Sequence, residues 1–496
     1  MGKRSNLYSS NLIQNFSYSM IRFFLAPILG IVIIGTTMAQ DQKEWTLQEC
    51  VKVALENNLR IKRSVYNVEN SQINLLQSKA AFLPSFNASG AYGKNYGRSV
   101  NPVTNLFVNS NINSINVSGN SALTLFNGMR IQNTLRQNQR DYSAAGQDLE
   151  KAKNDVIINV VTLYTNVIFN KELFETAKYQ LNSSQQQLER LKKQVAAGSL
   201  AMTNQLNQEA QVATNEVNLI NQENALNFSA LQLKQAMQLP SSTPLDVVIP
   251  EIQMEDLVID QTAQEVYQIA LQEMPEIKSA VLKVESAQFA LKASKGNLYP
   301  RLSLNGTITS NYSSASDRAR VALDGGTAPE QIGYVQGTNS PVFRDVQTFS
   351  VISENYGEKD QLKDNVFRAV SLGLTIPLFN GLQTRSTMQR AIISKEIASI
   401  SQQETENTLR QSIETAFNDA VAASKSYGAS LKQVSAREEA YRMTKQRFES
   451  GAANFVEYQI SENDLFQSKS DLSRAKYNFI FKKKILDFYQ GKPMEY

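Results

Sequence analysis

Two long stretches of the chain carry an apolar residue at every seventh position. A seven-residue step corresponds to 3.5 residues per helical turn, which predicts left-handed coiled coils. The first stretch predicts a helix over about 131–195, and at 1.5 Å per residue such a helix spans roughly 100 Å. Each stretch ends at a glycine, Gly198 or Gly451, and a helix of about 38 residues then returns to complete a hairpin. The repeating positions are Val160, Val167, Phe174, Leu181, Leu188 and Val195 in the first stretch, and Ile413, Ala420, Tyr427, Val434, Tyr441 and Phe448 in the second.

Shorter segments alternate apolar and polar residues instead. The alternation is clear at 302–309, 370–376 and 116–125, and weaker at 85–93. A period of two predicts strands with one apolar and one polar face, which suits a wall between lipid and water, although an ordinary β-sandwich has the same pattern. Four strands cannot close a lipid-spanning barrel alone, whereas twelve strands from three chains can.

The chain is internally duplicated. Residues 46–55 match 262–271, an offset of 216 residues that holds to Pro84 and Pro300. The sequence Leu-Phe-Asn-Gly occurs at 125–128 and again at 378–381, and this offset of 253 residues persists to Gly198 and Gly451. The second copy therefore carries 37 extra residues between about 301 and 377, where a surface loop between two strands is expected. Two copies are too few for a solenoid and indicate equivalent parts of one symmetric wall.

These patterns divide the mature chain into two structural repeats. The first, 40–239, and the second, 262–490, each contain helices, two strands and a helical hairpin. Residues 240–261 contain three prolines and are expected to link the repeats, and 491–496 form a C-terminal tail.

The N-terminal region is expected to be a signal peptide over residues 1–39. Arg22 precedes the apolar run 23–34, and small residues follow up to Ala39, which is the order that signal peptidase recognises. A membrane anchor is the alternative, but the run is shorter than the about 20 apolar residues that span a bilayer. Met20 is a second candidate for the start of the chain.

Composition argues against enzymatic chemistry. The 496 residues include no histidine and one cysteine, Cys50, so histidine-dependent triads, intrachain disulfides and Cys-rich metal sites are excluded. Cys50 is expected to be a small buried apolar residue. The formal net charge is only +4, and no glycine-rich phosphate loop precedes a helix. We therefore expect no catalytic, cofactor or metal site and no nucleic-acid partner.

The chain resembles the TolC family of outer-membrane efflux proteins over about residues 45–490. The resemblance is carried by the duplication, the strand pairs, the Leu-Phe-Asn-Gly turns into long helices, and the hairpin tips at 197–199 and 450–452. It implies a mixed α and β fold: an outer-membrane β-barrel, four strands per chain and twelve per trimer, continued through the periplasm by an α-helical coiled-coil barrel. It also implies a homotrimeric export channel of a tripartite efflux or secretion system, with a periplasmic adaptor and an inner-membrane pump as partners.

The resemblance also implies residues for two sites at the tips. An acid six residues after the second tip glycine helps to ring the periplasmic gate in this family, and Glu457 has that position. The matching residue of the first repeat is Asn204, and Ala453 stands where the family has a basic residue. Packing of Phe448, Phe455 and Met202 is therefore expected to help close the gate. The tip residues expected to dock the adaptor are Gly198, Ser199, Gly451 and Ala452.

One alternative function belongs to another class. A periplasmic coiled-coil scaffold or adaptor without a membrane barrel would explain the helical hairpins. It would not explain alternating strands at matched positions of both repeats. A wide polar tube selects little, so the pump is expected to choose the exported substrate.

Overall fold

The structure, a computed structural model, describes residues 44–100, 107–109, 111–249, 259, 261–314, 320–353 and 356–492. The expected signal peptide, much of the inter-repeat segment and the last four residues lie outside the described residues. Glu44–Tyr496 is one compact unit by its internal contacts.

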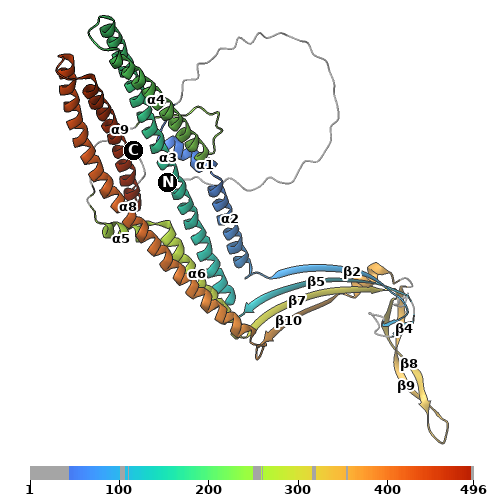
Figure 1. The fold of residues 1–496 in the computed structure, drawn as a ribbon. Helices are drawn as coiled ribbons and strands as arrows, with labels where there is room; N and C mark the ends of the chain where they lie inside the picture. The colour runs from blue at the N-terminus through green and yellow to red at the C-terminus, as the bar shows by residue number, and fades with distance from the viewer. Residues whose placement is uncertain are drawn as a thin grey trace, which may run out of the picture. The chain divides into compact units, whose positions relative to one another are not determined.

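The first repeat runs from a short strand through two helices and a strand pair into a helical hairpin (Figure 1). Its elements are β1 (Glu44–Trp45), α1 (Leu47–Asn57), α2 (Leu59–Ala80), β2 (Ser85–Asn95), β3 (Arg98–Val100), β4 (Phe107–Asn109), β5 (Ile112–Phe126), α3 (Arg130–Ala196) and α4 (Met202–Ala236). The next strand, β6 (Asp246–Val247), pairs with β1 in parallel.

The second repeat follows the same order with one insertion. Its elements are α5 (Ala263–Glu273), α6 (Pro275–Lys295), a 3-10 turn (Gly296–Leu298), β7 (Arg301–Ser313), β8 (Arg320–Tyr334), β9 (Pro341–Ser353), α7 (Glu358–Asp364), β10 (Phe367–Thr375), α8 (Gln383–Glu449) and α9 (Phe455–Tyr489). Both α3 and α8 contain 67 residues, and both α4 and α9 contain 35. The long helical hairpins predicted from the heptads are therefore present in each repeat.

The structure adds two details to the sequence-based expectation. Each repeat starts with two helices, which are separated at Asn58 and at Met274, where the backbone is extended. Asn58 caps the following helix by accepting from the amide of Arg60 at 2.8 Å, and Pro275 occupies the first turn of α6, where its missing N–H is harmless. The expected surface loop in the 37-residue insertion contains instead an antiparallel hairpin of β8 and β9.

One antiparallel sheet has the strand order β10-β7-β5-β2. In the first repeat Ser85 pairs with Ala122, and in the second Arg301 pairs with Thr375. Offsets of 216 and 253 residues convert the first pair into the second, so the two repeats have the same strand register. The duplication is therefore present in the hydrogen bonding as well as in the sequence.

The main helical core joins α1, α3 and α4. Val160, Tyr164 and Ile168 of α3 pack with Cys50 and Leu233, and all five are at most 1% exposed. Cys50 is thus the buried apolar residue that was expected. Burial raises the pKa of its thiol to about 12, which disfavours the reactive thiolate. Among the described helices, none has a stretch both long and apolar enough to cross a membrane.

Candidate functional site

Both hairpins turn at a glycine with a left-handed backbone. Gly198 has φ 74° and Gly451 has φ 75°. The amide of Gly198 donates to the Val195 carbonyl at 2.9 Å, and that of Gly451 to Phe448 at 3.0 Å. The next residue, Ser199 or Ala452, donates to the carbonyl five residues before it, which completes a Schellman motif. A Cβ on either glycine would meet nothing within 4 Å, so glycine is required there for its backbone conformation.

An aromatic cluster joins the two hairpins directly behind the tips. Phe455 and Tyr458 of α9 are each 3% exposed and pack against Leu191 of α3 and the partly buried Leu200. The rings of Phe448 and Phe455 lie 6.0 Å apart, and those of Phe448 and Tyr458 stack at 5.1 Å. The sequence-predicted residues Phe448 and Phe455 are therefore in contact.

Glu457 lies outside this cluster, on the exposed side of the first turn of α9. Its amide donates to Oδ1 of Asn454, the residue that caps α9, at 2.8 Å. Its carboxylate lies 3.8 Å from the guanidinium of Arg447 near the end of α8. Arg447 thus supplies the positive charge beside Glu457 that the family pattern would place at position 453.

A cavity of about 580 Å³ lies between the two tips. Its lining includes Ser199, Asn204, Phe448, Gly451 and Phe455. Five of the nine residues predicted for the gate and for docking therefore share one cavity. Met202, by contrast, is 53% exposed, and Gly198 and Ala452 are exposed at the outer surface of the tips.

Glu462 is a buried acid in this region that the sequence analysis did not single out. Its side chain is 7% exposed, and it accepts hydrogen bonds from Tyr458 and Ser183, both at 3.3 Å. Burial raises the pKa of its carboxyl, and the two hydrogen bonds oppose that rise. The signal was present in the sequence: Phe455, Tyr458, Glu462 and Leu465 follow core spacing on a helix, with an acid at one core position.

The four-stranded sheet is the second candidate site, because its two faces differ in chemistry. Residues that pair directly across strands lie on the same face of the sheet. One face is apolar and contains the paired row Phe86, Ser121, Gly306 and Val370. The same face includes Leu123, Leu304, Ile308, Leu372 and Leu374. Phe86 is 75% exposed and Val370 79%. An apolar surface of this extent, open on a sheet in one chain, indicates a lipid or protein contact.

The opposite, polar face of the sheet carries small uncharged residues. Its rows include Ser85, Ala122, Asn305 and Ser371, then Asn87, Asn120, Thr307 and Ala369. Ser89 and Ser118 hydrogen-bond through their hydroxyls at 2.7 Å, and Thr307 donates to Asn120 at 3.2 Å. Such a face is suited to water, so the sheet matches the wall of a water-filled pore.

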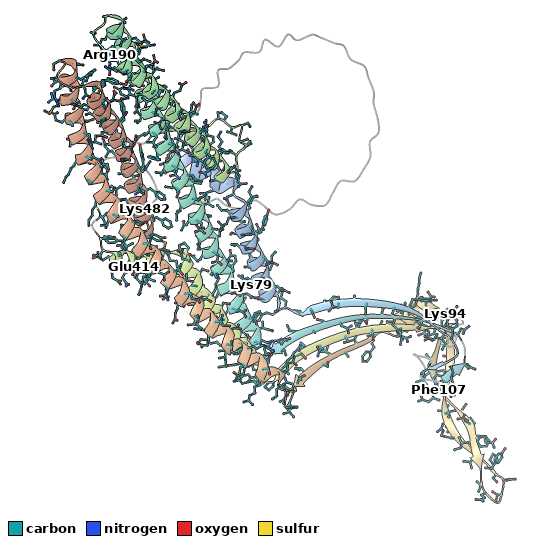
Figure 2. The ribbon with its side chains drawn as sticks, in the orientation of Figure 1. Lys79, Lys94, Phe107, Arg190, Glu414 and Lys482 are labelled. Atoms are coloured by element: carbon teal, nitrogen blue, oxygen red, sulfur yellow. The ribbon has the colours of Figure 1, made fainter. Side chains whose placement is uncertain are left out.

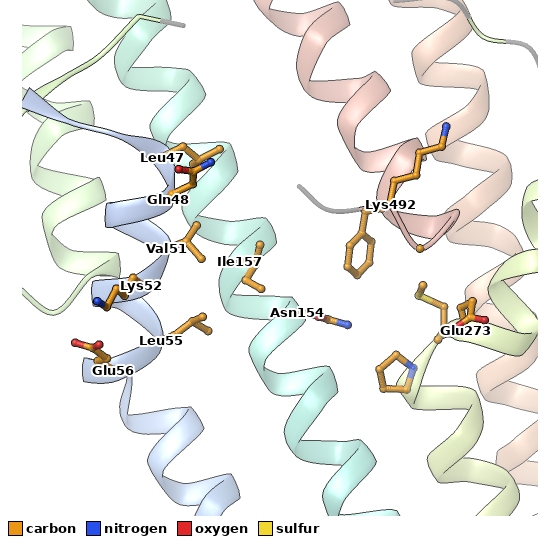
Figure 3. Close-up of a pocket in the computed structure, with 14 residues that line it drawn as sticks. Leu47, Gln48, Val51, Lys52, Leu55, Glu56, Asn154, Ile157, Glu273 and Lys492 are labelled. Atoms are coloured by element: carbon orange, nitrogen blue, oxygen red, sulfur yellow. The ribbon is translucent and has the colours of Figure 1, made fainter. Parts of the chain in front are cut away.

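Another cavity, about 740 Å³ in volume, lies between the repeats and away from the tips (Figure 3). Leu47, Val51 and Leu55 of α1 form one wall, and Met274 and Phe488 contribute to the other. In the part of the chain that the structure describes, no group of three or more His, Cys, Asp or Glu side chains could hold a metal ion.

Comparisons with known proteins agree with this architecture. The family model described as outer membrane efflux protein matches residues 50–237 and 266–483. An uncharacterized protein of Haemophilus influenzae is 25% identical over 285 residues, which are 57% of this chain and 60% of that relative. The match thus spans less than two thirds of the relative's own length.

Solved structures of outer-membrane channels have the same fold. CmeC of Campylobacter jejuni matches with a TM-score of 0.69 at 16% identity, over 91% of this chain and 87% of its own. The open state of MtrE of Neisseria gonorrhoeae matches with 0.64 at 16%, over 90% and 89%, and VceC of Vibrio cholerae with 0.67 at 14%, over 90% and 97%. The expected combination of barrel strands and long helical hairpins, duplicated within the chain, is confirmed.

Proposed function

The chain belongs to the outer membrane efflux protein family, and from this premise we propose that three copies form one passive export channel. The protein resides in the outer membrane, with its helical hairpins in the periplasm. The observation that carries the proposal is the four-stranded sheet, with one apolar face, one polar face and two edge strands that pair with no further strand among the described residues.

The two edge strands of the sheet are β2 and β10. By the repeat offsets β2 corresponds to β7 and β10 to β5, and β5 and β7 pair with each other inside the chain. Edge strands in lipid must find partners for their backbone groups. Inside the chain Ala122 of β5 pairs with Asn305 of β7. The repeat offsets convert this pair into Thr375 of β10 and Ser89 of β2, so these two residues are proposed to pair between neighbouring chains. Three such junctions close a ring of twelve strands.

The helices next to the sheet support the same junction. Inside the chain α3 and α6 are joined by ion pairs, Arg140 with Glu285 at 2.9 Å and Lys283 with Asp148 at 2.8 Å. The equivalents of Arg140 and Asp148 on α8 are Ile393 and Ser401. The proposed junction therefore lacks both of these ion pairs, and Ile393 brings apolar surface to it.

That apolar surface is exposed in a single chain. Exposed apolar residues of α8 and α2 are Ile393 at 57%, Ile397 at 58%, Ile400 at 56%, Tyr66 at 68% and Ile73 at 62%. Covering them is favourable by about 25 cal/mol per Å². Contact between α8 of one chain and α2 of the next would bury both stripes.

We propose further that the hairpin tips form the periplasmic gate. Phe448, Phe455, Asn204, Glu457 and Met202 are the residues assigned to it. The aromatic cluster holds the two hairpins of a chain together near their ends, and three copies of Glu457 around a threefold axis would form a negative ring that favours cations. Arg447, 3.8 Å from Glu457, would weaken that ring while the two remain paired.

Channels of this family work in tripartite efflux systems. We propose that the exposed tip residues Gly198, Ser199, Gly451 and Ala452 dock a periplasmic adaptor, which connects the channel to an inner-membrane pump. The channel itself is proposed to do no chemistry, so the energy for export would come from the pump.

The test is fractionation followed by mass measurement of the detergent-extracted protein. The proposal expects the protein in the outer-membrane fraction and a particle of three chains after extraction. A periplasmic scaffold or adaptor would be released without detergent, and a single-chain particle in detergent would exclude the closed ring.

A further inference from the structure

A chain of hydrogen bonds crosses three helices just behind the tips. The hydroxyls of Tyr441 on α8 and Tyr458 on α9 lie 3.2 Å apart. Tyr458 donates to the Glu462 carboxylate, and Ser183 of α3 donates to the same oxygen, each at 3.3 Å. Glu462 therefore connects the second hairpin, α8 and α9, to the first.

The surroundings of Glu462 make its negative charge costly. The side chain is 7% exposed, and among the described residues it has no ion-pair partner. The charged and titratable groups that face it are Arg190 from α3, Tyr441 and Lys445 from α8, and Tyr458 from α9. Arg190, labelled in Figure 2, is instead hydrogen-bonded to Gln187 at 3.0 Å.

The repeat offers an internal comparison. At the offset of 253 residues, Glu462 corresponds to Glu209, but Tyr441 and Tyr458 correspond to Leu188 and Gln205, and Ser183 corresponds to Ala436. Glu209 is only partly buried and accepts from Gln205 on its own helix at 2.9 Å. The three-helix network is therefore a property of this one position and not of the duplicated framework.

We propose that Glu462 is a pH-dependent latch, a positioning residue that ties α9 to α3 and holds the two hairpins of a chain together when it is protonated. This inference rests on the proposed role of the tips as a gate. A neutral Glu462 can stay buried with its hydroxyl partners, whereas an ionised one gains by reaching water, and it can do so only if the hairpins separate.

The direction of the pH effect follows from the burial. The pKa of Glu462 is raised in the packed arrangement, so that arrangement binds a proton more readily than the separated one. The stabilisation of the packed tips is fully present below the ordinary carboxyl pKa. It is lost as pH rises through the raised pKa, so acid favours the closed arrangement.

The experiment measures the separation of the hairpins directly. Spin labels are placed at the exposed positions Gln185 on α3 and Ile460 on α9 of the full chain, and labelled chains are diluted with unlabelled ones. In the native background the distance should lengthen and broaden from pH 5 to pH 8. Glu462→Gln, which keeps the acceptor oxygen and removes the charge, should hold the short distance at both pH values.

Two further variants separate a latch from a merely structural role. Glu438→Gln removes an exposed carboxylate of α8, paired with Lys469 at 2.9 Å, and should leave the pH response unchanged. Tyr458→Phe keeps the ring but removes a hydrogen bond that lowers the pKa of Glu462, so the midpoint should move to higher pH. A pH response that persists in Glu462→Gln would overturn the proposal, as would an unmoved midpoint in Tyr458→Phe.

Conductance recorded on the same proteins distinguishes a failure of the proposed latch from a failure of the proposed gate. A distance that follows Glu462 supports the latch even if the conductance does not change with pH, and in that case the gate assignment fails and not the latch. A conductance change with pH while the distance stays fixed would refute the latch.

Discussion

The backbones of Gly128 and Gly296 pack against each other, because a Cβ built on Gly128 would clash with the carbonyl oxygen of Gly296. Gly128 also has φ 66°, in the turn that starts α3, while Gly296 follows α6. The contact thus fixes the start of one repeat's long helix against the other repeat. Its equivalent, Gly381, has φ 61° but nothing within 4 Å. At the repeat offset of 216 residues, Gly296 corresponds to Ala80. In a closed ring, Ala80 of the next chain would therefore lie against Gly381.

Gly128→Ala is expected to destabilise each folded chain more than Gly381→Ala. Both place a side chain on a left-handed backbone, which costs about 1–3 kcal/mol, but only Gly128→Ala adds a clash within the chain. Thermal unfolding followed by helical circular dichroism measures the difference. Gly381→Ala should instead lower the yield of trimers from folded chains, and equal unfolding temperatures for the two variants would contradict this account.

The long helices were predictable because the same helix–helix contact repeats every seven residues along the chain. Val160 and Ile413 lie in heptads because they face a neighbouring helix over many turns, and both are buried. The break at Asn58 was not predictable from periodicity, since one capping side chain decides it locally. The hairpin of β8 and β9 was missed because three register shifts interrupt its alternation, so no period of two extends along it.

The hairpin tips of the candidate site were predictable because the local backbone conformation determines them. Gly198 and Gly451 mark the tips because only glycine readily takes that backbone conformation. Glu462 was missed because a carboxylate on a polar helix is usually solvated. Its core spacing with Phe455, Tyr458 and Leu465 was a signal in the sequence, and the packing of three helices shows that it is buried. Met202 was placed with the gate by its nearness to the tip, but it is exposed in the single chain, and its role stays a prediction.

Removal of the Phe455 side chain should loosen the tips. Phe455 is 3% exposed, and truncating a buried phenylalanine costs about 3–5 kcal/mol. Because the lost contacts join the two hairpins, Phe455→Ala is expected to raise the conductance of idle channels in planar bilayers. Ile460→Ala, at a position of the same helix that is 57% exposed, is the matched control. An unchanged conductance in Phe455→Ala would remove the aromatic cluster from the gate.

Glu457→Gln should lower the preference of the channel for cations while leaving the trimer yield intact. Three carboxylates around the pore axis attract cations, and the neutral amide does not. Reversal potentials in a salt gradient measure this preference. Asn204→Asp, which adds an acid at the equivalent tip position, should raise it. If neither variant shifts the reversal potential, these residues do not line the constriction.

Tyr164→Phe should weaken the link between α3 and the small sheet of β1 and β6. The Tyr164 hydroxyl lies 2.7 Å from the carbonyl oxygen of Val248 and 3.1 Å from that of Trp45. The Trp45 carbonyl still accepts from the amide of Val248 at 3.1 Å, so the expected cost is that of one ordinary hydrogen bond, about 0.5–1.5 kcal/mol. Denaturant unfolding measures it, with Tyr179→Phe as control because Tyr179 is 70% exposed. Equal stability of the two variants would show that the hydroxyl contributes nothing.

The closed ring is tested most directly by a cysteine pair across the proposed junction, Ser89→Cys with Thr375→Cys. Directly opposed residues of antiparallel strands have Cα atoms about 4.5–5.5 Å apart, within reach of a disulfide. In a single chain β2 and β10 are the opposite edges of the sheet, so the bond can form only between chains. Oxidation in the outer membrane should give a covalent trimer on non-reducing gels, while Ser89→Cys with Gly373→Cys, two residues out of register, should give little. Only monomers from the matched pair, or equal cross-linking by both pairs, would contradict the proposed channel.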